Sequence, residues 1–437
     1  MALDGGILIV AGTRPELIKL APVFEQLKGR NMPFTFIWSG QHYDYELSRI
    51  FIKELQMPEP DFNLDVGSGS HATQTAKAMV GVEEAVRKFK PALALALGDT
   101  NTVAATALSS VKIGIPFVHV ESGLRSWDET MPEEINRKIA DHVAQLLFTP
   151  SALATTNVLN EGVSKSRIFH VGNTVIDVLF KHLKLAEKQS SGLKERLNLD
   201  ADEYFLATFH RQENVDNPER LRGIIKALIK LSKHMKIVIP SHPRTKKQLI
   251  ELNLHKPLLE NKNIVFLDPL GYFEFLGLLN GAKVVLTDSG GVQEEAFTLK
   301  VPTITLRYNT ERPETILLGC NVLAGADEDR IVDCTHKMVE LRENICSKLR
   351  DKPNPYGDGH AGEHIANVLE KAIKNGIALQ SPDLRDKPLI TYNLKSVKKV
   401  IASDEVLSLF DKKGKAVSEK RSAEKVVVRN AMDSKVY

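Results

Sequence analysis

The stretch Val120-Glu-Ser-Gly-Leu-Arg-Ser-Trp-Asp-Glu-Thr-Met-Pro-Glu-Glu-Ile-Asn-Arg137 follows an apolar, strand-like segment, Ile115–Val120. It leads into a helix that we expect to end near His142, and a second apolar segment, Leu146–Thr149, comes next. A strand, a helix and another strand form a βαβ unit, which requires a parallel sheet. Glu121 stands at the carboxyl end of the first strand, where open α/β sheets bind their ligands. The stretch therefore predicts a fold class and a place for chemistry.

The second half of this stretch has two compatible interpretations. Thr130-x-x-Glu133, with Pro132 inside, is a capping-box pattern that would start the helix. The expected helix also allows side-chain pairs at i,i+4 spacing, namely Glu134–Lys138 and Arg137–Asp141. Alternatively, Glu133 joins Glu121 in proton transfer, and the stretch alone leaves both roles of Glu133 open.

Strand-like apolar runs recur along the chain with helical segments between them. They are Ile7–Ala11, Phe34–Trp38 and Ala92–Leu97 in the first part, and Tyr204–Phe209, Ile237–Pro240, Ile264–Leu267, Val284–Thr287 and Thr303–Leu306 in the second. A chain of 437 residues is too long for one ordinary core. We therefore expect an α/β protein with two doubly wound parallel sheets facing a central cleft.

Charge and composition exclude several classes of function. The net charge is +3, but residues 380–437 hold 13 Lys and Arg against 8 Asp and Glu, which leaves −2 for the rest. The body is therefore not a nucleic-acid surface by charge, and the basic tail is expected to be poorly ordered or a small appended element. No apolar run reaches 18 residues and the start lacks a basic region, so neither a membrane span nor a signal peptide is expected. Three cysteines without close pairing predict reduced, buried thiols in a cytoplasmic protein.

Two glycine-containing turns are candidate anion sites. Gly12-Thr-Arg-Pro-Glu16 joins a strand to a helix with Thr13 as the expected N-cap, and Arg14 could add a guanidinium fork for phosphate. Asp288-Ser-Gly-Gly291 does the same in the second half, with Ser289 placed to cap a helix that carries Glu294 and Glu295. The alternative for each is a tight turn that binds nothing.

Other polar residues follow the remaining strands of the second half. His210 follows the first of them and is either a cleft residue or an exposed loop histidine, and Arg312 offers a second cation for phosphate. Asp327-Glu-Asp329 resembles the metal-binding DxD signature, but acids in the first turn of a helix, Arg330–Leu341, explain it better. We therefore predict no metal.

A set of motifs in fixed order gives a more specific interpretation. They are Gly12-Thr-Arg-Pro-Glu16, Gly98-Asp-Thr100, His119-Val-Glu-Ser-Gly-Leu-Arg125, Pro132-Glu-Glu-Ile-Asn-Arg137, Gly172-Asn-Thr-Val-Ile-Asp177, His210-Arg211, Asp288-Ser-Gly-Gly-Val-Gln-Glu-Glu295, Thr310-Glu-Arg-Pro-Glu314 and Asn354-Pro-Tyr-Gly-Asp-Gly359. Together they resemble the non-hydrolysing UDP-N-acetylglucosamine 2-epimerases over about residues 5–375.

The resemblance implies a GT-B-like pair of Rossmann-like domains. It gives an N-terminal domain at 1–175, completed by a crossover helix within 355–376, a UDP-binding domain at 176–354, and an extension of unknown role at 377–437. It also implies reversible conversion of UDP-GlcNAc to UDP-ManNAc by anti elimination of UDP, through 2-acetamidoglucal, followed by re-addition. No cofactor, nucleic acid or membrane partner is implied, and a homodimer is expected.

The resemblance also assigns residues. The expected catalytic positions are Asp99, Glu121, Glu133 and His210. Those expected to bind substrate or UDP are Arg14, Lys19, Asp99, Glu121, His210, Phe275, Ser289, Gly290, Gly291, Glu295 and Arg312. Gln41 and His42 match a region where bacterial members bind a second, regulatory UDP-GlcNAc. Leu270 replaces a glutamine found in some members and is left outside these assignments.

Three alternatives remain open. A GT-B glycosyltransferase would share the fold and the diphosphate site, and a hydrolysing epimerase would release free N-acetylmannosamine and UDP. A sugar-nucleotide sensor would keep a binding site without catalysis. The presence of every acid and of His210 argues against the sensor.

Overall fold

The first sheet of the computed structural model consists of strands that are apolar on both faces. All five residues of β1 (Ile7–Ala11) and of β4 (Leu93–Leu97) are buried, which explains their continuous apolar sequences. The strands pair in parallel in the order β3-β2-β1-β4-β5-β6-β7. The other members are β2 (Phe34–Trp38), β3 (Phe62–Asn63), β5 (Phe117–Val120), β6 (Leu146–Thr149) and β7 (Ile168–His170).

Helices cover both faces of this sheet. Ile7 and Ile9 of β1 pack on one side with Leu17 of α1, whereas Leu8 and Val10 pack on the other side with residues of α3, α4 and α5. This division follows from the alternation of side chains along a strand. The helices of this part are α1 (Arg14–Gly29), α3 (His71–Phe89), α4 (Asn101–Lys112), α5 (Pro132–Val143), α6 (Ala152–Asn160) and the 3-10 turn η1 (Lys165–Arg167).

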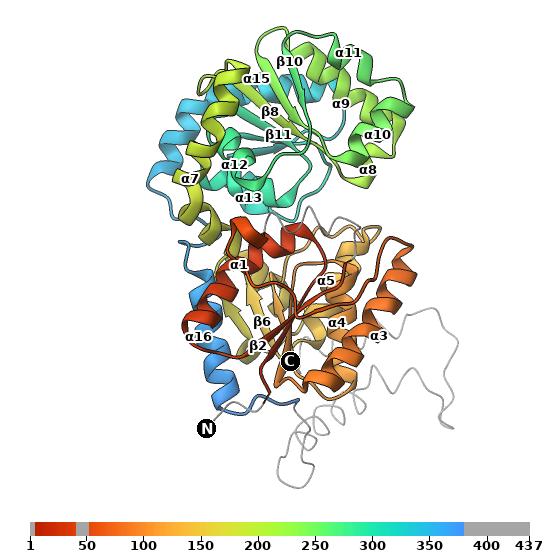
Figure 1. Ribbon diagram of the computed structural model, residues 1–437. Helices are drawn as coiled ribbons and strands as arrows, with labels where there is room; N and C mark the ends of the chain where they lie inside the picture. Colours follow the sequence, from red (N-terminus) through yellow and green to blue (C-terminus); the bar gives the residue numbers. More distant parts are fainter. Residues whose placement is uncertain (1–4, 41–51, 380–437) are drawn as a thin grey trace, which may run out of the picture. The chain divides into compact units, whose positions relative to one another are not determined.

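The second sheet repeats the architecture in the upper part of Figure 1. Its parallel order is β10-β9-β8-β11-β12-β13. Its strands are β8 (Tyr204–Thr208), β9 (Lys236–Pro240), β10 (Ile264–Leu267), β11 (Val284–Thr287), β12 (Thr303–Thr305) and β13 (Asn321–Leu323). Its helices are α7 (Thr174–Leu197), α8 (Gln212–Val215), α9 (Pro218–Leu231), α10 (Pro243–Glu251), α11 (His255–Leu259), α12 (Tyr272–Asn280), α13 (Gly290–Thr298), α14 (Pro313–Leu317) and α15 (Glu328–Arg350). The predicted fold class of two doubly wound parallel sheets is confirmed.

The last helix, α16 (Ala361–Lys374), lies beside α1 of the first part and not beside the second sheet (Figure 1). Gly362 makes this approach close, because a Cβ there would meet Pro22 at 2.8 Å. Asp177 of α7 accepts hydrogen bonds from the backbone N–H groups of Ala361 and Gly362, at 3.0 and 2.7 Å, and so caps α16. The chain thus returns to its first half, although the domain boundaries themselves remain predictions.

Several expected elements differ from the structure. The final strand of the second sheet is β13, not the segment near Thr303, and the strands β3 and β7 were not expected at all. Each of these three edge strands has only two or three residues, too few for a periodic pattern to show. The helix α15 continues to Arg350, nine residues beyond the expected Leu341. Asp327 is its N-cap, in agreement with the prediction that Asp327-Glu-Asp329 begins a helix. All three cysteines are free, but only Cys320 is buried.

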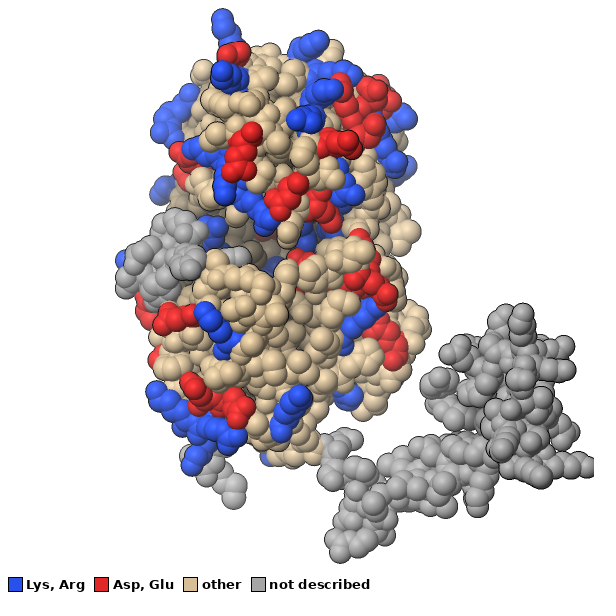
Figure 2. Space-filling model, turned by 90° about the vertical axis from the view of Figure 1, so that its right-hand side faces the viewer, with Lys and Arg blue, Asp and Glu red and all other residues tan. Residues whose placement is uncertain are grey.

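The structure describes residues 5–40 and 52–379. The contacts of the chain divide it into Met1–Ala378 and Leu379–Tyr437, and the expected basic extension thus falls almost wholly outside the described residues. None of the helices formed by the described residues combines the length and apolar character needed to span a bilayer. On the face shown in Figure 2, Lys and Arg are interspersed with Asp and Glu. Neither the basic nor the acidic residues form a continuous patch there.

Candidate active site

Four of the residues assigned from sequence, Arg14, Asp99, His210 and Ser289, come from the two places where strand order reverses. In the first sheet β1 lies between β2 and β4, and in the second sheet β8 lies between β9 and β11. Ligands of open α/β sheets bind at such switch points, outside the carboxyl ends of the strands. Arg14 follows β1 and Asp99 follows β4, while His210 follows β8 and Ser289 follows β11. The face of the molecule shown in Figure 2 has a hollow in its middle, with Lys or Arg side chains near it.

Glu121 follows β5 in a left-handed backbone conformation, with φ of +67°. Such a conformation is costly for a residue with a Cβ and is typical of functional sites. Its buried carboxylate accepts two hydrogen bonds of 2.7 Å from Lys19 Nζ, and Arg312 of the second half lies 3.9 Å away. Burial alone would raise the pKa of Glu121, but the charges of Lys19 and Arg312 outweigh it and hold the pKa below its ordinary value. Glu121 is therefore an ionised carboxylate at neutral pH.

Two residues that the sequence interpretation did not assign connect Glu121 to the second half. The Nδ2 atom of Asn173 donates to Glu121 at 3.0 Å and to Glu294 at 2.9 Å, and Glu294 also accepts a hydrogen bond from Arg312 Nε. Burial raises the pKa of Glu294 to about 7, against the opposing charges of Arg312 and Lys19. Its Oε2 atom has no hydrogen-bond partner among the described residues. The resemblance assigns the adjacent Glu295 to substrate or UDP binding, and nothing in the sequence shows that Glu294 is the glutamate that contacts Arg312.

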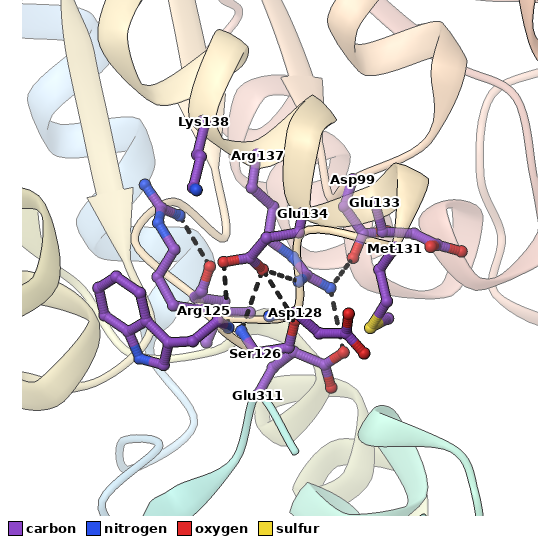
Figure 3. A network of polar contacts seen from close by, with 12 residues as sticks. Asp99, Arg125, Ser126, Asp128, Met131, Glu133, Glu134, Arg137, Lys138 and Glu311 are labelled. Atoms are coloured by element: carbon purple, nitrogen blue, oxygen red, sulfur yellow. Dashed lines mark hydrogen bonds and ion pairs between the residues drawn. The ribbon is translucent and has the colours of Figure 1, made fainter. Parts of the chain in front are cut away.

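Asp99 belongs to a network centred on Arg137 (Figure 3). Arg137 Nη2 lies 2.5 Å from Asp99 and 3.4 Å from Glu311 of the second half, and its Nη1 lies 2.7 Å from Glu134. Burial alone would raise the pKa of Asp99, but the charges of Arg137 and Arg211 outweigh burial and hold the pKa below its ordinary value. This carboxylate is therefore also ionised. The expected pairing of Arg137 with Asp141 is wrong, because the buried Asp141 instead contacts His119 and Arg125.

The start of α5 corrects the expected capping box. The N-cap is Met131, not Thr130, and it contributes no side-chain hydrogen bond. Thr130 instead bonds to Asp128, with its N–H at 3.0 Å and its hydroxyl at 2.6 Å from Oδ1. Glu133 therefore does not form a capping box with Thr130. Its partly exposed carboxylate lies 3.7 Å from Arg211 Nη1 of the second half.

Another expected pair on α5 is also wrong. Lys138 bonds to Glu129 at 2.8 Å and not to Glu134. Glu134 is fully buried and accepts bonds from Ser126 and Trp127 as well as from Arg137. Its partners hold the loop between β5 and α5, so Glu134 organises the stretch that carries Glu121 and Glu133.

His210 lies at the end of β8 with its side chain 38% exposed. Its Nδ1 is 3.7 Å from Asp288, which also accepts the N–H groups of His210 and Arg211 at 2.9–3.0 Å. Desolvation lowers the pKa of His210, and the nearby charges of Arg211 and Arg14 lower it too, against the attraction of Asp288. A neutral imidazole at pH 7 can accept a proton.

The residues predicted to bind the diphosphate lie at the start of α13. Ser289 is the N-cap, but its hydroxyl makes no capping bond, so the free N–H groups of the first turn are not satisfied by it. A Cβ at Gly290 would meet the Arg312 guanidinium at 3.5–3.6 Å, whereas one at Gly291 would meet nothing within 4 Å. A helix N-terminus, an adjacent arginine and open space above a glycine suit a diphosphate.

Two other assigned residues lie behind this first turn. Glu295 is buried and accepts a hydrogen bond of 2.8 Å from the hydroxyl of Tyr272. Burial raises the pKa of Glu295 to about 7, and Glu294 adds to the effect while the bond from Tyr272 opposes it. Phe275, on α12 with Tyr272, packs partly buried against the core of the second part.

The turn after β1 contains another carboxyl that the sequence interpretation did not assign. Thr13 is the N-cap of α1, as predicted, and Glu16 accepts the N–H groups of Gly12 and Thr13 at 2.6 and 2.8 Å and the Thr100 hydroxyl at 2.7 Å. Burial raises the pKa of Glu16 to about 7 against these hydrogen bonds. Arg14 is half-buried at this turn.

Gln41 and His42 lie outside the described residues, so the regulatory assignment remains a prediction. Within residues 5–40 and 52–379, no cluster of three or more His, Cys, Asp or Glu side chains is arranged to hold a metal ion.

Comparison with known proteins is consistent with this geometry. The UDP-N-acetylglucosamine 2-epimerase family model matches residues 25–370. A UDP-N-acetylglucosamine 2-epimerase of Methanocaldococcus jannaschii is 46% identical over 365 residues, which cover 83% of this chain and 98% of that protein. One of Methanococcus maripaludis is 45% identical over 364 residues, with 83% and 97% covered. The crystal structure of the M. jannaschii UDP-GlcNAc 2-epimerase in complex with UDP-GlcNAc and UDP aligns with a TM-score of 0.77 at 44% identity, covering 84% of this chain and 99% of that one.

Two doubly wound sheets with charged groups at both switch points place the chain in the GT-B-like class of nucleotide-sugar enzymes. Within that class it belongs to the UDP-N-acetylglucosamine 2-epimerase family. It is therefore an epimerase, an isomerase of nucleotide sugars.

Proposed function

We propose that this enzyme interconverts UDP-GlcNAc and UDP-ManNAc by inverting C2 of the sugar. The observation that carries the proposal is the contact network around Glu121. Through Lys19, Asn173 and Arg312 it joins an ionised carboxylate of the first sheet to the anion cradle of the second. Proton transfer and departure of a diphosphate from one substrate need such groups in a single site.

The second half is suited to hold UDP. The first turn of α13, at Ser289, Gly290 and Gly291, offers backbone N–H groups to the diphosphate, and Arg312 supplies a guanidinium beside it. Arg14 approaches from the turn after β1, near enough to influence His210. Glu295 and Phe275 lie on α13 and α12, and we assign them to the nucleoside end.

The first half is suited to proton transfer at C2. The C2 proton is weakly acidic, so its removal must accompany cleavage of the bond between C1 and the UDP oxygen, whose electrons leave with UDP. The product of this anti elimination is 2-acetamidoglucal. Asp99 and Glu121 are ionised and stand at the ends of neighbouring strands, and Glu133 and His210 complete the set. Protonation of C2 on the opposite face and re-addition of UDP at C1 then give the epimer.

Product analysis distinguishes this function from the alternatives. Incubation with UDP-GlcNAc alone should give a mixture of UDP-GlcNAc and UDP-ManNAc by NMR. Stoichiometric free N-acetylmannosamine and UDP would identify a hydrolysing epimerase, and consumption of substrate only with an added sugar acceptor would identify a glycosyltransferase. Binding without turnover would identify a sensor.

The proposal includes the domain boundaries given above, a cytoplasmic location and a homodimer. The mass of the protein in solution, measured by light scattering, tests the homodimer, since a chain of 48.6 kDa should then give about twice that mass.

A further inference from the structure

A buried ionic cluster lies directly behind the two carboxylates Asp99 and Glu121. His119 of β5 and Asp141 of α5 are both fully buried, and His119 Nδ1 lies 2.6 Å from Asp141 Oδ1. The other ring nitrogen, Nε2, lies 2.8 Å from the carbonyl oxygen of Gly98. Because a carbonyl oxygen can only accept, Nε2 carries a proton and donates it to Gly98.

Asp141 has further donors around it. Its Oδ2 accepts the backbone N–H of Gly123 at 3.0 Å and lies 2.8 Å from Arg125 Nη1. Arg125 in turn binds Glu161 with two bonds of 2.7 and 2.6 Å. Burial would raise the pKa of Asp141, but His119 and Arg125 outweigh it and lower the pKa. Each carboxylate oxygen of Asp141 therefore has at least one partner within the cluster.

The two backbone groups held by the cluster belong to the two turns that carry the carboxylates. Gly98 precedes Asp99, and a Cβ on Gly98, whose φ is +94°, would lie 3.8 Å from Glu121 Oε2. Gly123 follows Glu121 by two residues and is packed so closely that a Cβ would lie 2.1 Å from the Ala154 carbonyl oxygen. Asp141 thus fixes the Glu121 turn directly, and it fixes the Asp99 turn through His119.

We propose that His119 is a positioning residue that sets the placement of Asp99 relative to Glu121 through its hydrogen bond to the Gly98 carbonyl. Its fully buried side chain does not reach the substrate. The inference rests on the proposed epimerisation, because it assigns these two carboxylates to that reaction. A displacement of a reacting group by about 1 Å can reduce a rate about a hundredfold.

Two substitutions at His119 separate this role from simple packing. In His119→Gln the amide nitrogen can replace Nε2 and still donate to Gly98, but the bond to Asp141 is lost. In His119→Asn the shorter amide can replace Nδ1 at Asp141, but it cannot reach Gly98. Both variants lose one bond and some buried volume, so a purely structural role predicts similar kinetics for the two.

The expected result is a split between the variants in kcat and not in UDP binding. His119→Asn should reduce kcat about 10- to 100-fold, with the Kd for UDP within about twofold of wild type, whereas His119→Gln should stay within about threefold in both. His142→Asn, on the exposed side of α5, is the matched control and should behave as wild type.

Equal kcat values for folded Asn and Gln variants, or a parallel loss of UDP affinity in the Asn variant, would overturn the positioning role. If the Asn variant does not fold, the Gln variant decides alone, and a kcat loss above about tenfold in folded His119→Gln overturns it. A wild-type enzyme that forms no UDP-ManNAc would overturn the proposed function and this inference together. A contrary result for the His119 variants, with an active wild-type enzyme, would overturn this inference alone.

Discussion

At the scale of single residues, Glu121 is held by several constraints at once. It combines a left-handed backbone, burial and two strong hydrogen bonds from Lys19. Glu121→Gln keeps the shape and can still accept a hydrogen bond from Lys19, but it cannot take a proton. We expect kcat to fall at least about a hundredfold with little change in the Kd for UDP, measured by calorimetry.

The same substitution at Glu83, a partly exposed residue of α3, provides the control and should leave kcat unchanged. Turnover of Glu121→Gln at the wild-type rate would remove Glu121 from the mechanism.

Glu295 gives a prediction about pH and stability. Its pKa is raised by burial from 4.5 to about 7 in the folded protein, so the folded state holds a proton that the unfolded state releases between these values. The free energy of unfolding should therefore fall as pH rises from about 4.5 to about 7, and one such group contributes about 3 kcal/mol. Glu295→Gln removes this contribution and can still accept the Tyr272 hydroxyl.

Urea unfolding at several pH values checks this prediction. The stability of Glu295→Gln relative to wild type should be greater at pH 8 than at pH 4.5. A difference between the two proteins that stays constant over this range would contradict it.

The candidate residues could be predicted where a sequence motif contains them. They could not be predicted where only tertiary contacts bring a residue to the candidate site. Asp99, Glu121 and His210 each follow a strand, so the sequence predicts that they lie at the carboxyl edges of their sheets, as the structure shows. Asn173 and Glu294 act through contacts between segments far apart in the chain, since Asn173 lies 52 residues from Glu121 and 121 residues from Glu294. No local pattern contains that information.

At the scale of secondary-structure elements, α5 is the clearest link between the halves. Arg137 contacts Asp99 and Glu134 of the first part and Glu311 of the second, and it is almost fully buried. Removing a buried cation leaves its carboxylates unpaired. Arg137→Ala should therefore reduce the free energy of unfolding by about 3–5 kcal/mol in urea unfolding experiments.

Lys138→Ala, one residue further along α5, is the matched control, because Lys138 pairs with Glu129 at the surface. Its stability should remain close to that of wild type. Equal effects of the two substitutions would contradict the role given to Arg137.

Elements were predictable in proportion to their length and burial. Strands of four or five buried residues, such as β1 and β4, have continuous apolar sequences that identify them. The edge strands β3, β7 and β13 do not, and the start of α5 was displaced by one residue because Asp128 binds Thr130. Competition between local hydrogen bonds, which decides such a boundary, is not visible in a capping pattern.

At the scale of the whole molecule, every assigned site residue except Gln41 and His42 lies in the described part of Met1–Ala378. The family model ends at residue 370, within this unit. A chain shortened to end at Ala378 should therefore fold and epimerise with kcat within about twofold of the full chain. Loss of activity in the folded, shortened enzyme would show that the extension contributes to the site.

The central claim is that the enzyme breaks and remakes the C2–H bond of a UDP-sugar. The most direct measurement is NMR of UDP-GlcNAc incubated with the full chain in D2O. The account predicts UDP-ManNAc together with deuterium at C2 in the recovered sugar nucleotides, because the removed proton exchanges with solvent before C2 is reprotonated. Well-folded enzyme that binds UDP but leaves C2 fully protonated would contradict it.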